Sequence, residues 1–121
     1  MKGDPGIYVR HIIGSIRLIE EYIEGKTEVD FKNTISLQDM VFRRLEIIGE
    51  AVKNLPDSLK SAYPEIPWKS IAGMRDKLIH QYFGVDIVLT WNAVVQDIPR
   101  LKTQMLSIAR SLHLDVDTGF D

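Results

Sequence analysis

The residues best suited to chemistry lie in one short stretch of the sequence, residues 73–84, which is bracketed by two glycines. Within eight positions this stretch contains Arg75, His80 and Tyr82. A guanidinium can bind a phosphate, and an imidazole can transfer protons near neutral pH. Guanidinium, imidazole and phenol are together groups that can handle a phosphate, so we take this stretch as the candidate active site.

The stretch has the pattern of one amphipathic helix with an unusual apolar face. At about 100° per residue, Arg75 and Tyr82 fall near the middle of the face that collects the apolar side chains. The apolar members are Trp68, Ile71, Ala72, Leu78, Ile79 and Phe83. An unpaired buried charge is costly, so such breaks in the pattern are expected mostly at functional or interface positions. His80 and Arg75 diverge by about 140° on a straight helix, so either the helix bends or a second subunit completes a site for one small anion.

Three carboxylates are candidates to support these groups. Asp76 precedes His80 by four positions, a spacing at which a carboxylate can touch the imidazole, orient its tautomer and favour its charged form. Glu46 and Glu50 lie one turn apart on the preceding long helix. Either glutamate could meet Arg75 where the helices pack, as a structural bridge or as a support for the site, and the sequence does not choose between them.

Each candidate also has an ordinary structural explanation. A histidine beside an apolar face is more often a packing or surface residue than a catalytic one. Arg75 could form a structural ion pair with a neighbouring helix as readily as it could bind an anion. Tyr82 is more often a half-buried tyrosine with a satisfied hydroxyl than a reactive group. Composition and spacing therefore single out this helix but do not decide its role.

Four long amphipathic segments form the framework around the stretch. Their apolar residues recur at spacings of three and four, which predicts helices over residues 5–24, 36–55, 67–83 and 86–112. A polar connection is expected over residues 26–33, and a short extra helical turn between Pro56 and Pro67. An all-α antiparallel four-helix bundle would bury the four apolar stripes, so we expect a single domain over residues 1–121.

Several residues predict where these helices begin and end. We expect Ser36 to cap the second helix and Pro67 to lie in the first turn of the third. Gly84 is expected to end the third helix and Asp86 to cap the fourth. Pro99 lies inside an apolar register that continues beyond it, which predicts a kink rather than a break.

Composition excludes several classes of function. The chain has 121 residues, no cysteine and only three histidines, at scattered positions without metal-ligand spacing. We therefore expect chemistry that needs neither a metal nor a cofactor. Neither a membrane-spanning apolar run nor a signal peptide is recognisable, and we expect a cytoplasmic protein. The net charge of -2 argues against a broad surface for nucleic acid, so any contact with RNA must be local.

These residues resemble a known family. The spacing Arg75-x-x-x-x-His80-x-Tyr82 on the third long helix of an all-helical domain is similar to the HEPN superfamily, and specifically to the HepT-like toxins. The similarity extends to Leu-Glu-Ile-Ile-Gly-Glu-Ala-Val-Lys at residues 45–53, to Ile-Pro-Trp at residues 66–68, and to the run from His80 to Asp86. One departure is Asp76, because many HEPN ribonucleases have a polar amide after the arginine.

The resemblance implies a toxin endoribonuclease of a toxin-antitoxin pair. In such a protein a homodimer, which can build higher oligomers, brings two motif helices face to face and forms one composite site from paired Arg75 and His80. His80 would transfer the proton as an RNA 2′-hydroxyl attacks its own phosphorus, and Arg75 would hold the phosphate, without a metal. The implied partner is a nucleotidyltransferase antitoxin of the MNT type, which would inactivate the toxin by transferring AMP to Tyr82.

Two other hypotheses remain open at this point. The acidic charge and Asp76 are compatible with a non-catalytic HEPN module that binds a nucleotidyltransferase or a nucleotide. A purely structural dimerising bundle, in which Arg75 and Tyr82 only pair across the interface, is the third hypothesis.

Overall fold

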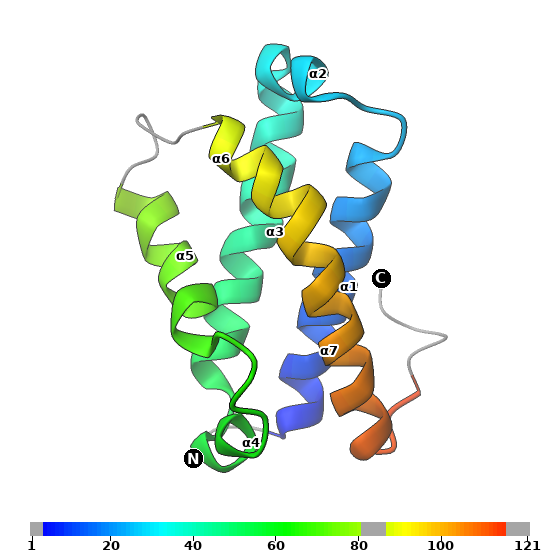
Figure 1. The fold of residues 1–121 in the computed structure, drawn as a ribbon, viewed down its shortest axis with the longest axis vertical. Helices are drawn as coiled ribbons and strands as arrows, with labels where there is room; N and C mark the ends of the chain where they lie inside the picture. The colour runs from blue at the N-terminus through cyan, green and yellow to red at the C-terminus, as the bar shows by residue number, and fades with distance from the viewer. Residues whose placement is uncertain (1–3, 81–86, 116–121) are drawn as a thin grey trace.

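The computed structural model describes residues 4–80 and 87–115 of the chain, and these are α-helical apart from short connections and one π-helical turn (Figure 1). The helices are α1 (Pro5–Ile23), α2 (Glu28–Asn33), α3 (Ile35–Asn54), α4 (Asp57–Ala62), α5 (Trp68–His80), α6 (Ile87–Asn92) and α7 (Ile98–Ser111), and the π-helical turn is Ala93–Asp97. The predicted all-α bundle is confirmed. None of the described helices is both long enough and apolar enough to cross a lipid bilayer.

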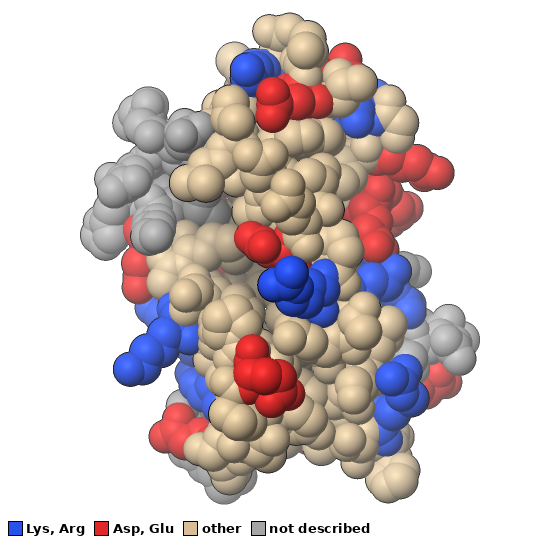
Figure 2. All heavy atoms as spheres, in the orientation of Figure 1, with Lys and Arg blue, Asp and Glu red and all other residues tan. Residues whose placement is uncertain are grey.

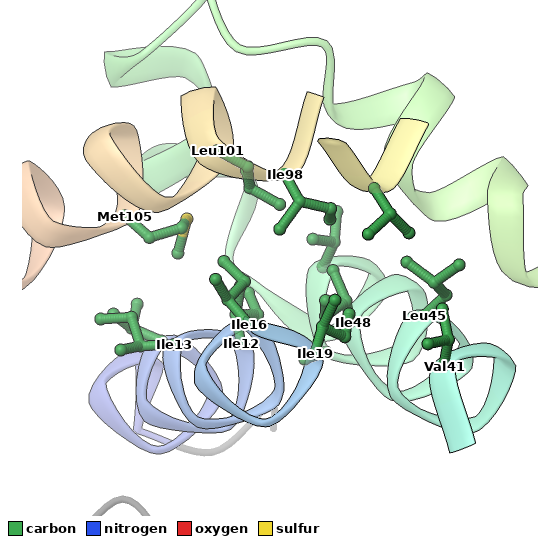
Figure 3. Close-up of a cluster of buried hydrophobic side chains, with 14 of the residues drawn as sticks. Ile12, Ile13, Ile16, Ile19, Val41, Leu45, Ile48, Ile98, Leu101 and Met105 are labelled. Atoms are coloured by element: carbon green, nitrogen blue, oxygen red, sulfur yellow. The ribbon is translucent and has the colours of Figure 1, made fainter. Parts of the chain in front are cut away.

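The bundle is held together by apolar side chains from three of its long elements. Helix α1 packs against α3 and α7, and α3 packs in turn against α5. Figure 3 shows Ile12, Ile16 and Ile19 of α1 facing Leu45 and Ile48 of α3. Ile98, Leu101 and Met105 of α7 close the same cluster, and all of these side chains are at most 5% exposed. This burial is the main stabilising contribution to the fold, because apolar area removed from water is its principal driving force.

The first two helices begin at side-chain caps. The Gly6 amide donates to Asp4 Oδ1 at 2.8 Å, which satisfies an amide at the start of α1 that has no partner within the helix. In α2 the Asp30 amide donates to Thr27 Oγ1 and the Thr27 amide donates to Asp30 Oδ2, which is a reciprocal capping box. The polar connection expected over residues 26–33 is therefore largely helical. Only Phe31 of α2 is buried, too little to produce a periodic signal.

The start of α3 differs from its prediction. The helix begins at Ile35 with Thr34 as its N-cap residue, and Thr34 makes no side-chain capping bond, so the prediction that Ser36 caps the helix is wrong. The junction is stabilised instead by Gln38, whose side-chain amide donates to the carbonyls of Phe31 at 2.8 Å and Lys32 at 3.1 Å. These two bonds satisfy carbonyls at the end of α2 that have no partner within that helix, and they tie α2 to the first turn of α3.

The short helical turn predicted before the third long helix is confirmed as α4. The Trp68 indole Nε1 donates to the carbonyls of both Lys60 and Tyr63 at 3.0 Å, and this contact folds the end of α4 onto the first residue of α5. Pro67 immediately precedes α5, and its carbonyl accepts the amide of Ile71 at 3.1 Å. Proline suits this position because no intrahelical acceptor exists there for an amide.

The irregularity predicted at Pro99 lies in the turn that precedes it. The Ile98 amide donates to the Ala93 carbonyl, five residues back, which gives the π-helical turn Ala93–Asp97. Pro99 has no amide hydrogen and crowds the carbonyl four residues earlier, so a regular α-helical turn is unfavourable there. The end of the third helix predicted at Gly84 and the cap predicted at Asp86 lie outside the described residues.

Candidate functional site

Helix α5 carries the backbone of three of the predicted site residues, Arg75, Asp76 and His80. The side chains of Arg75 and His80, and Tyr82 as a whole, lie outside the described part of the structure. What the structure establishes around them is the position of α5 against α3, and the side chains that α3 and α1 place nearby.

Asp76 contacts α3 through an ion pair that the sequence did not reveal. The Lys53 ammonium donates to Asp76 Oδ1 at 3.1 Å, with side-chain exposures of 39% for the lysine and 47% for the aspartate. Sequence spacing pointed Asp76 toward His80 on its own helix. The structure adds a cation from the neighbouring helix, and this cation partly offsets the negative charge that Asp76 brings next to Arg75.

The Lys53–Asp76 contact joins α3 and α5, which run antiparallel (Figure 1). Lys53 also lines a groove together with Trp68 and Ala72, so the end of α3 lies beside the first half of α5. The later half of α5, which carries the motif, therefore packs toward the middle of α3. The stretch at residues 45–53 and the motif on α5, which are distant in sequence, thus lie beside each other.

Glu46 and Glu50 line a polar cleft between α1 and α3. The cleft has a volume of about 280 Å³, and its other polar lining residues are Tyr8, His11, Arg43 and Asn54. The ring of His11 lies edge-on to Tyr8, with a centroid separation of 6.5 Å. The structure thus groups both glutamates with an arginine and a histidine. That one of them meets Arg75 stays a prediction.

Two of these cleft residues were not selected from the sequence. Neither Arg43 nor His11 belongs to a motif in the sequence, and both are exposed. Only the packing of α1 on α3 brings them to the same cleft. Lys53 was missed for the same reason, because a pair 23 positions apart has no periodic signature. Among the described residues, no three histidine or acidic side chains gather as a set that could hold a metal ion.

Comparison with known proteins identifies the family. Residues 12–108 match the family described as "Ribonuclease HepT-like". The chain is 49% identical over 102 residues to a protein of Thermococcus cleftensis named "Probable ribonuclease HepT", covering 84% of this chain and 93% of that protein. It is 43% identical over 104 residues to a "Putative RNase" of Caldanaerobacter subterraneus, covering 86% of this chain and 93% of that protein.

A further relative is longer than this chain. A Methanocaldococcus jannaschii protein named "Gamma-glutamylcyclotransferase and putative RNase" is 55% identical over all 121 residues, but the chain spans only 54% of its length. No solved structure matches the chain significantly. The family match spans α5 and nearly all of the bundle, which agrees with the resemblance found in the motif. The chain belongs to the HepT-like ribonuclease family of the HEPN superfamily.

Proposed function

We propose that this chain is an endoribonuclease that cleaves RNA with Arg75 and His80, without a metal ion. The observation that carries the proposal is the family match over residues 12–108, which includes the helix on which both residues stand. The names of the two relatives that this chain covers almost completely point to the same activity.

The proposed reaction is an internal transfer at phosphorus. The RNA 2′-oxygen forms a bond to the adjacent phosphorus as the bond from phosphorus to the 5′-oxygen breaks. One imidazole takes the 2′-hydroxyl proton, and a proton is delivered to the departing 5′-oxygen, so the products are a 2′,3′-cyclic phosphate and a free 5′-hydroxyl. Arg75 binds the phosphate and stabilises the charge that develops on its oxygens.

A homodimer would supply a second copy of the Arg75 guanidinium and of the His80 imidazole. On one straight helix Arg75 and His80 diverge by about 140°. The two side chains of a single α5 therefore cannot both contact the same phosphate. A surface suitable for a second copy lies next to the end of α5, where Val88 and Leu89 of α6 are 38% and 67% exposed. Figure 2 shows few charges over this part of α6. Contact with a second copy would remove the apolar area of these two side chains from water.

The remaining part of the proposal is regulation by a partner. As a toxin, the chain would act in the cytoplasm together with a nucleotidyltransferase antitoxin. The Tyr82 hydroxyl would attack the α-phosphorus of ATP, forming a phosphodiester to AMP and releasing pyrophosphate. The added phosphate would bring negative charge and bulk next to Arg75, which would exclude RNA.

The test is RNA cleavage by the purified chain in the presence of a chelator. We expect the parent protein to cleave, and His80→Ala and Arg75→Ala to cleave at least a hundredfold more slowly. Arg110→Ala and His113→Asn are matched controls, because both residues are exposed near the end of α7. His113 has a φ of 57°, a conformation that asparagine tolerates. Equal cleavage by all five proteins would overturn the proposal.

The second candidate is a non-catalytic module that binds a nucleotidyltransferase or a nucleotide. It is favoured by Asp76, which places a carboxylate directly after the arginine that would hold the phosphate. This candidate predicts a stable complex with a nucleotidyltransferase and no cleavage of RNA by the isolated chain. Nuclease activity that disappears in His80→Ala would exclude it.

A further inference from the structure

A groove rich in lysine lies where α3, α4 and α5 meet. Its volume is about 610 Å³, and each of the three helices contributes one lysine to its lining, namely Lys53, Lys60 and Lys69. The other lining residues are Asp57, Ser61, Ile66, Pro67, Trp68 and Ala72. The chain has a net charge of -2, so three lysines along one groove are a local concentration of positive charge.

The three lysines differ in what they contact. Lys53 is paired with Asp76 and is therefore largely compensated. Lys60 has a side chain that is only 22% exposed, and its ammonium donates to the Val52 carbonyl at 3.4 Å.

Lys60 also lies 3.9 Å from Asp57, a carboxylate that is 94% exposed and well solvated. Lys69 is exposed, and no carboxylate in the described part of the chain pairs with it. Lys60 and Lys69 therefore keep positive charge at this groove, because a 3.9 Å pair with a well-solvated carboxylate neutralises Lys60 less than the 3.1 Å contact neutralises Lys53.

The side of α5 that lines the groove through Lys69 and Ala72 also carries two positions of the motif. Lys69, Ala72, Asp76 and His80 follow one another at spacings of three, four and four, so these four positions share one face of the helix. From Lys69 to His80 the helix rises about 16 Å. Lys69 lines the groove at one end of this face, and the proposed proton-transfer residue stands at the other.

We propose that this groove binds phosphates of the RNA strand outside the bond that is cut, with Lys60 and Lys69 as the contacts. The inference rests on the proposed ribonuclease function and adds a path for the substrate. A small number of lysines at one groove gives the local RNA contact that an acidic chain requires, because ammonium groups bind phosphates and release counterions. Because Lys69 and His80 share one face of α5, the bound RNA strand would run along that helix.

The experiment measures RNA binding without cleavage. Fluorescence anisotropy of a labelled single-stranded RNA is recorded against salt concentration, with every protein carrying His80→Ala. The test variant adds Lys60→Gln and Lys69→Gln. The matched control adds Lys26→Gln and Lys32→Gln, which remove two exposed lysines near α2, at the opposite end of the bundle. A rescue variant carries arginine at positions 60 and 69.

Each phosphate contact on a single strand contributes about 0.7 to the slope of log affinity against log salt. We therefore expect the test variant to lose about 1.4 from that slope, which corresponds to about 25-fold weaker binding at 0.1 M salt. The control and rescue variants should retain the parent slope. Circular dichroism verifies that the test variant is folded.

The outcomes separate this inference from the proposed function. If the test variant is folded and its salt slope is unchanged, the proposed RNA-binding role of the groove is refuted, even if cleavage by the parent chain depends on His80. A slope that depends on Lys60 and Lys69 supports the groove, even if no protein cleaves RNA and the nuclease proposal fails. If the parent does not bind RNA, or if the two lysines affect only the binding of a partner protein, the inference is wrong.

Discussion

Replacing Lys53 by methionine tests how the ion pair between α3 and α5 affects the proposed chemistry. The substitution keeps the apolar stem of the side chain and removes the ammonium that contacts Asp76 at 3.1 Å. Asp76 then lacks the cation that α3 places beside it, one position after Arg75. The double variant Lys53→Met, Asp76→Asn removes both charges and so restores the local balance.

The expected magnitudes follow from distance and exposure. Both side chains are roughly two-fifths exposed or more, so the pair should stabilise the fold by about 0.2–1 kcal/mol. A carboxylate and a phosphate about 8 Å apart in water repel each other by about 0.5 kcal/mol, which is about a twofold effect on binding. With more than one phosphate nearby, we expect Lys53→Met to cleave RNA about two to five times more slowly. The double variant should be close to the parent.

The assay is kcat/KM for RNA cleavage at low and at high salt, with stability measured in parallel by urea unfolding. The matched control is Lys102→Met, which breaks the pair with Glu20 at 3.0 Å between α7 and α1, where the exposures are 33% and 42%. It should cost similar stability without slowing cleavage. The effect of Lys53→Met should vanish at high salt, because screening is then complete within a few ångströms. The reasoning is refuted if Lys53→Met slows cleavage no more than Lys102→Met, or if the double variant is no faster than Lys53→Met.

Three further predictions concern the framework around the site. Trp68→Phe removes the indole donor that two carbonyls of the α4–α5 connection share, and should lower the free energy of unfolding by about 1 kcal/mol in urea titrations. Ile48→Ala opens a cavity in the core, and the same titration should show a loss of about 2–5 kcal/mol, whereas exposed Val29→Ala should cost far less. The backbone hydrogen bond from Thr27 holds the pKa of Asp30 below its ordinary value, so protection of α2 from amide exchange should persist at neutral pH and decline as pH falls through that lowered pKa. In Asp30→Asn this decline should be absent, and an unchanged pH profile would contradict the assignment.

The long helices and the core were predictable because their signals are averaged over many residues. In α1 and α3, isoleucine, leucine and valine recur along 19 and 20 residues, so a few exceptions do not hide the period. The six residues of α2 have one buried side chain, and its capping box was the only local signal. Ser36 was chosen by residue type, but α3 begins one residue earlier, at Ile35, and the side chain that bonds across the junction is Gln38.

The candidate site was predictable only in part. The types and spacing of Arg75 and His80 marked the motif helix, because a charged residue within an apolar periodic pattern can be recognised from the sequence alone. The pairing of Lys53 with Asp76 and the grouping of Arg43 with Glu46 depend on how helices pack, which periodicity does not determine. The groove at Lys60 and Lys69 likewise exists only when α4 folds back onto α5.

The π-helical turn Ala93–Asp97 sets how α6 is rotated about its own axis. Thr90, Val94 and Ile98 are all buried, although in an unbroken α-helix eight residues would turn Thr90 by about 80° away from Ile98. The wider turn absorbs that rotation and leaves Leu89 directed to solvent. Removing a single residue from this turn would twist α6 by about 100° and present different side chains outward. The number of residues in this one turn therefore determines which side chains of α6 face solvent.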